Sequence, residues 1–62
     1  MQIIAIYIFR NAQAADNALE QLWRNFNGGF ERSAGGELWI NSSISNPYLA
    51  GQICESLGGI AK

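Results

Sequence analysis

Residues 3–9 read Ile-Ile-Ala-Ile-Tyr-Ile-Phe, a run without charge in which β-branched and aromatic side chains dominate. Such a run is typical of a β-strand. A half-buried strand would alternate apolar with polar residues, but this one is apolar throughout. The two-residue period places Ile4, Ile6 and Ile8 on one face and Ile3, Ala5, Tyr7 and Phe9 on the other. Both faces of the strand are therefore predicted to need cover.

The chain has 62 residues, which predicts a single domain spanning residues 1–62. One core of this size rarely gives more than ~3–5 kcal/mol of net stability without a disulfide, a metal or oligomerisation. Cys54 is the only cysteine, so we interpret it as a buried apolar side chain on a helix. Histidine is absent and the acidic residues are scattered, so no metal and no other cofactor is expected. Oligomerisation or partner binding remains, and we expect a homodimer.

The charges and the length of the apolar run argue against two classes of partner, nucleic acids and membranes. Arg10, Arg24, Arg32 and Lys62 are the only basic residues, and they do not cluster. Nucleic-acid binding depends on clustered cations, so the charge pattern disfavours it. The apolar run ends before Arg10 and is far shorter than the ~20 residues of a membrane helix. We therefore interpret it as a core strand, expect no membrane partner and, from the lone thiol, predict a cytoplasmic protein.

A first helix follows the apolar strand. Its apolar stripe recurs at spacings of three and four and consists of Ala15, Ala18, Leu19, Leu22, Trp23 and Phe26. Asn11 or Asp16 is suited to cap its start. The sequence Asn27-Gly28-Gly29 is expected to end the helix with a left-handed cap.

A second helix follows Ser45 and Asn46, either of which can cap it, with Pro47 in its first turn. Gly58-Gly59 ends it, and residues 60–62 form a short tail. Its core stripe is expected to comprise Leu49, Ile53 and Leu57, with Ala50 and Cys54 beside them. Gly51 is interpreted as tolerated rather than as the site of a close backbone approach.

Between the helices the sequence predicts a hairpin, with strands at residues 30–33 and 37–41 and a turn at Ala34-Gly35-Gly36. Leu38 and Ile40 face the core, and Trp39 lies partly exposed on the other face. The predicted order is β-α-(β)-β-α, an α+β fold with two helices packed on a two- or three-stranded sheet. If both helices cover one face, the opposite face of the first strand needs a second molecule. If they flank the sheet, a monomer is possible.

The residue inventory disfavours catalysis. There is no histidine, and Ser or Cys nucleophiles need a neighbouring base. Glu31 and Glu37 could approach each other across the hairpin, but on an exposed ribbon we interpret them as solvated. We therefore expect no enzyme and no catalytic residues. A small enzyme or ligand-binding subunit would need a cavity between protomers, lined by Arg10 and glutamates.

Seven aromatic residues are more than so small a fold can enclose, and exposed Tyr and Trp favour protein interfaces. Trp23 and Phe26 are assigned to the core. The predicted partner-binding residues are Tyr7, Phe9, Arg10, Trp39 and Tyr48. We hypothesise a non-enzymatic protein-binding module that regulates or inhibits a larger protein by occupying its surface. Its size and composition suit a phage or mobile-element inhibitor of host defence, such as an anti-CRISPR protein.

The alternative is a small dimeric DNA-binding transcriptional regulator that reads DNA with the second helix. The outward residues of that helix contain no cation, which counts against this reading; they are Tyr48, Gln52, Glu55 and Ser56.

Overall fold

The computed structural model describes residues 2–62. Its elements are β1 (Ile3–Ile8), α1 (Ala12–Asn25), β2 (Phe30–Arg32), β3 (Glu37–Asn41), α2 (Pro47–Ser56) and β4 (Ile60–Ala61). The predicted α+β class, both helices and the hairpin are confirmed. The tail predicted after the second helix is instead a fourth strand, because it returns along the edge of β1, where Lys62 N–H donates to the Ile6 carbonyl at 2.9 Å.

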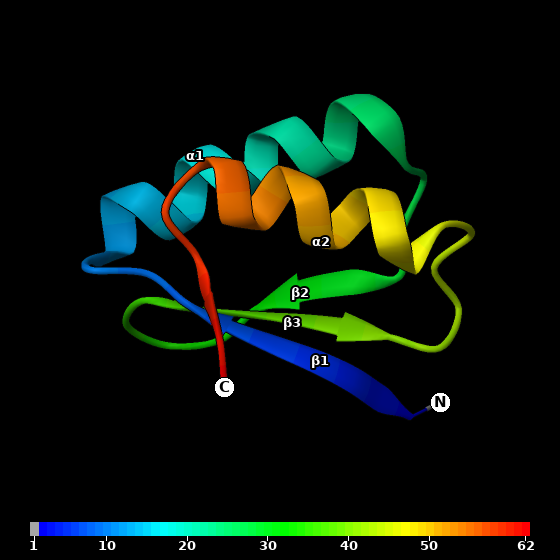
Figure 1. Ribbon diagram of the computed structural model, residues 1–62, viewed down its shortest axis with the longest axis horizontal. Coiled ribbons are helices and arrows are strands. Elements are labelled where there is room, and N and C mark those ends of the chain that lie inside the picture. Colours follow the sequence, from blue (N-terminus) through cyan, green and yellow to red (C-terminus); the bar gives the residue numbers. More distant parts are fainter. Residues whose placement is uncertain (1) are drawn as a thin grey trace.

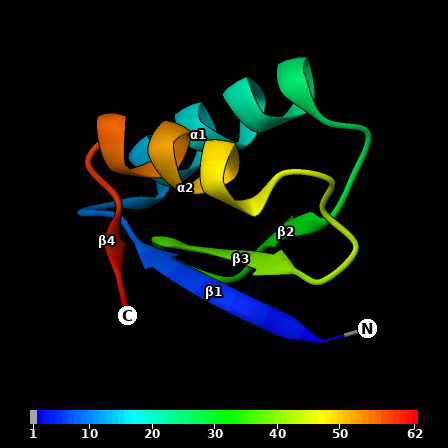
Figure 2. The same ribbon diagram turned by 45° about the vertical axis from the view of Figure 1, so that its right-hand side comes forward.

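The sheet is antiparallel, with strand order β2-β3-β1-β4. Strands β1 and β2 run in the same direction with β3 between them, and β1 separates β3 from β4 in the same way. This pair of split β-α-β units is the ferredoxin-like topology. Both helices lie on one face of the sheet (Figures 1 and 2), so the first of the two predicted arrangements is the one formed.

A register shift in β1 changes which residues share a face. Ile3 pairs with Asn41 but Ala5 pairs with Ile40, so Ile4 is an extra residue in the ladder. Neighbouring residues of β3 point to opposite faces. Ile3 therefore lies on the face away from the helices, and the prediction that it shares a face with Tyr7 was wrong.

Helix α1 begins after Asn11, one of the two residues predicted to cap it. Asn11 Oδ1 accepts from Ala14 N–H at 2.9 Å. The helix ends at Phe26, whose extended backbone takes the place of the predicted left-handed glycine cap. Phe26 is buried as predicted, but Trp23 is 56% exposed and lies edge-on to Phe30 with ring centroids 4.7 Å apart. The core assignment of Trp23 was wrong, because the side chain lies against Phe30 on the edge strand β2 and stays exposed to solvent.

Helix α2 packs by its small residues. Asn46 caps it, and its buried residues are Ala50, Gly51 and Cys54, while Leu49 and Leu57 are exposed. Leu49 and Leu57 of the predicted stripe are therefore rotated away from the core, whereas Ile53 packs against it as predicted. A Cβ at Gly51 would lie 2.7 Å from Tyr7 Oη, so this glycine allows a close approach between helix and sheet, contrary to the tolerance interpretation. Gly58 ends the helix with φ +94°, as predicted.

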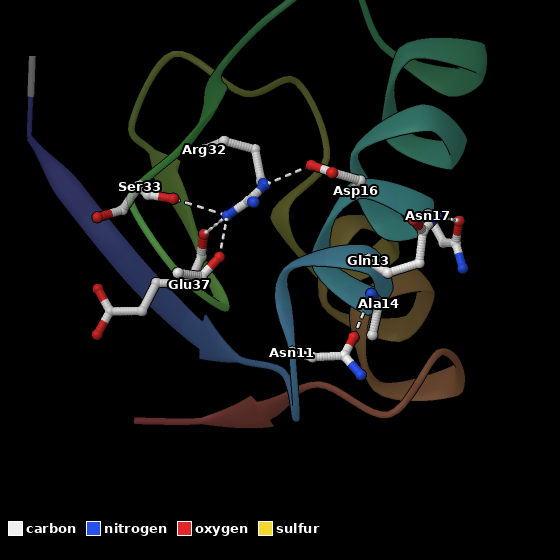
Figure 3. Close-up of polar contacts among 9 residues, drawn as sticks. Asn11, Gln13, Ala14, Asp16, Asn17, Arg32, Ser33 and Glu37 are labelled. Carbon is white, nitrogen blue, oxygen red and sulfur yellow. Dashed lines mark hydrogen bonds and ion pairs between the residues drawn. The ribbon is translucent and has the colours of Figure 1, made fainter.

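Arg32 joins the hairpin to α1 (Figure 3). Its guanidinium donates to Asp16 Oδ1 at 2.8 Å and to the carbonyl oxygens of Ser33, Gly35 and Glu37. One side chain thus closes the β2–β3 turn and orients it against the helix.

Candidate interaction surface

The face of the sheet away from the helices is apolar at its centre. Residues paired directly across strands share a face, and the pairing and the alternation along each strand assign nine residues to this one. We call it the open face; it comprises Ile3, Ile6, Ile8, Glu31, Glu37, Trp39, Asn41, Ile60 and Lys62. Ile8 is 39% exposed and Ile60 is 72% exposed. No segment of residues 2–62 covers this side of the sheet (Figure 2).

A row of four residues crosses the open face from edge to edge. Glu31 of β2 pairs with Trp39 of β3, which pairs with Ile6 of β1. Lys62 follows β4 and donates its N–H to the Ile6 carbonyl. We call these residues the central row. It carries an acid at the β2 edge, an indole and an aliphatic chain in the middle, and a cation at the β4 edge.

Polar contacts hold Trp39 in place on this face. Its indole Nε1 donates to Glu37 Oε1 at 3.1 Å, and Lys62 Nζ lies 3.6 Å from Glu37 Oε2. The indole hydrogen bond, helped by Lys62, lowers the pKa of Glu37. A general acid needs a raised pKa, so the shift at Glu37 runs against the carboxylate-pair chemistry considered for Glu31 and Glu37.

The predicted partner-binding residues are not brought together. Tyr7 and Phe9 are 8% and 4% exposed and lie in the core under the helices, so their side chains are not part of the open face. Trp39 lies on the open face, whereas Tyr48 is 76% exposed on α2, in the helical layer. Arg10 is exposed just beyond β1.

Arg10 lines a hollow of about 360 Å³ with Ala14, Asn17, Leu57 and Gly58. The hollow lies between the start of α1 and the end of α2. It contains one cation and no carboxylate.

Helix α2 presents Tyr48, Gln52, Glu55 and Ser56 to solvent. A phosphate backbone is attracted by cations, and these four side chains supply none. The DNA-reading alternative therefore gains no support from the exposed side of this helix.

Sequence reasoning did not place Glu31, Ile60 and Lys62 together on one face of the sheet. The alternation of Ile60, Ala61 and Lys62 after two glycines is a strand signal, but a run of three residues is too short to identify one. The row that joins Glu31 to Lys62 depends on the order of all four strands.

Comparisons with protein families, with curated proteins and with solved structures found no match for this chain. Within residues 2–62, no helix is long and apolar enough to cross a membrane. The same residues contain no group of three or more His, Cys, Asp or Glu side chains placed to hold a metal ion.

Proposed function

We propose that this protein is a non-enzymatic protein-binding module and that the open face is its interface. One observation carries the proposal: the helices cover one face of the sheet and leave Ile6, Ile8, Trp39 and Ile60 on the other. A continuous apolar surface rimmed by charged residues is typical of a protein interaction site. Trp39 is a residue type that often dominates the energy of such contacts.

The proposed action is occupation of a surface. The module regulates or inhibits a larger protein by covering part of it, without chemistry of its own. A small cytoplasmic inhibitor carried by a phage or mobile element, in the manner of an anti-CRISPR protein, is the setting that its size and composition suit. Tyr48, exposed on the helical layer, offers a second contact on the opposite side of the molecule.

The test uses a charge placed on the open face. Ile8→Lys puts an ammonium group opposite Glu37 in the β1–β3 ladder, where an opposite-charge pair supports the fold. Ser56→Lys is the matched control, because Ser56 is exposed at the end of α2. Immobilised wild-type and variant proteins are used to capture partners from a lysate of the source cells, and captured proteins are quantified by mass spectrometry.

We expect a partner that wild type and Ser56→Lys retain and that Ile8→Lys loses at least tenfold. Circular dichroism verifies that both variants are folded. Equal capture by all three proteins would show that the open face is not the interface. Copies of this chain itself are scored separately by a distinct tag.

A further inference from the structure

We infer that the occupant of the open face is a second copy of this chain, related by a two-fold axis that runs parallel to the strands. The inference rests on the proposed function, since it concerns the same surface: the second copy is the resting occupant of the open face, and a larger protein that binds there displaces it. It is carried by the charge order of the central row and by the area that a stable interface needs.

The charges of the central row are complementary to those of the same row read in the opposite order. A two-fold axis along the strands places the β2 edge of one sheet over the β4 edge of the other. Glu31 then faces Lys62 of the second copy, and Trp39 faces Ile6 of the second copy. Because a two-fold interface is isologous, each of these contacts forms twice.

The charges select this axis over the other one that keeps the strands aligned. An in-plane axis perpendicular to the strands and passing through the central row would place Glu31 over Glu31 and Lys62 over Lys62. Like charges juxtaposed across an interface disfavour an arrangement strongly. Aligned sheets pack face to face about 10 Å apart with a twist of about 30°, and both axes satisfy that packing. When the two central rows face each other, charge is therefore the term that decides between the axes.

The size of the molecule favours an occupant of the same outline. A standard interface buries about 800 Å² per partner, which is about a fifth of the 3854 Å² surface of this chain. An interface of that size requires most of one broad face. A second copy covers the whole face, because its own open face has the same dimensions and the same apolar centre.

The arrangement is tested by coupling carboxylates to amines with a water-soluble carbodiimide. Lys62 is the only lysine, so every lysine cross-link reports on one position. A mixture of nitrogen-15-labelled and unlabelled protein separates links between copies from links within one. We expect Glu31–Lys62 peptides that carry mixed labels. Glu37–Lys62 peptides with a single label come from the ion pair within one chain and serve as the internal standard.

Charge reversal gives the second measurement. In Glu31→Lys two ammonium groups meet the two Lys62 side chains, so the dissociation constant measured by light scattering across a dilution series should rise at least tenfold. Glu31→Gln should give a smaller rise. Glu55→Lys makes the same charge change on the exposed surface of α2 and should dimerise as wild type does.

A wild-type mass of 6.8 kDa at every concentration would overturn the inference. So would a dimer that Glu31→Lys leaves intact, or mixed-label links that omit Glu31. None of these outcomes contradicts the proposed function. That proposal is contradicted only if Ile8→Lys captures every partner as well as wild type does.

Discussion

At the scale of single residues, Cys54 ties stability to alkaline pH. Burial raises the pKa of its thiol from 9.0 to about 11, and Glu55 adds to the shift. The native state therefore keeps the proton that the unfolded state releases near pH 9. The contribution of this thiol to the free energy of unfolding is full below that pH and declines as the pH rises toward 11. Burial also raises the pKa of Tyr7, which extends the decline.

Urea unfolding measured from pH 8 to pH 11 should show this loss. Cys54→Ala, though less stable at pH 8 because it leaves a cavity, should lose less stability between those limits. If the urea midpoint fell by the same amount over this pH range in both proteins, the loss of stability could not be assigned to the thiol.

Gly51 shows how one missing side chain sets the distance between helix and sheet. Replacing glycine by alanine inside a helix usually stabilises it by about 1 kcal/mol. Here the new methyl group would lie 2.7 Å from Tyr7 Oη, so we expect Gly51→Ala to destabilise the protein by about 1–2 kcal/mol. In the Tyr7→Phe background the obstructing oxygen is gone. The cost of Gly51→Ala should then fall by half or more in a double-mutant cycle measured by urea unfolding.

At the scale of elements, Arg32 decides the geometry of the hairpin. Its side chain is 18% exposed and meets a carboxylate and three carbonyl oxygens. We expect Arg32→Ala to lower the free energy of unfolding by about 2 kcal/mol, because hydrogen bonds to a charged group are worth ~1.5–3 kcal/mol. Arg32→Lys keeps the charge but lacks the planar fork, so it should recover only part of the loss. Asp16→Asn should cost under about 1 kcal/mol, because an exposed ion pair contributes little.

The elements that could be predicted from sequence are those whose signal is local. Asn11 and Asn46 cap their helices through a hydrogen bond to a nearby backbone N–H. Strand β4 was missed because two residues carry almost no periodicity, and they are held by pairing with β1 alone. Trp23 was misplaced because its spacing fits a buried stripe, whereas in the structure it contacts Phe30 on the edge strand β2 and stays exposed.

At the scale of the whole molecule, the sequence predicts that the first strand has more apolar surface than this chain can cover. It does not predict which side stays open. That depends on both helices crossing the same face, and the register shift at Ile4 then adds Ile3 to the open side. Glu31 and Lys62 are 31 positions apart, and only the strand order places them at opposite ends of one row.

If the open face binds a second copy as proposed, stability depends on protein concentration. When a folded dimer unfolds to separate chains, mass action raises the melting temperature as concentration rises. We therefore expect the wild-type melting temperature to increase across a hundredfold concentration series followed by circular dichroism. Ile8→Lys inserts a charge into the interface of the proposed dimer but keeps a partner, Glu37, within its own sheet. Its melting temperature should be lower than that of wild type at high concentration and independent of dilution.

Ser56→Lys is the control for the added charge, since it changes the helical layer and leaves the sheet untouched. It should follow the wild-type dependence on concentration. If wild type and Ile8→Lys have the same melting temperature at every concentration, the open face adds no stability beyond that of the single chain. The stability of the 62 residues would then come from the one core beneath the helices, and a second copy would have no part in it.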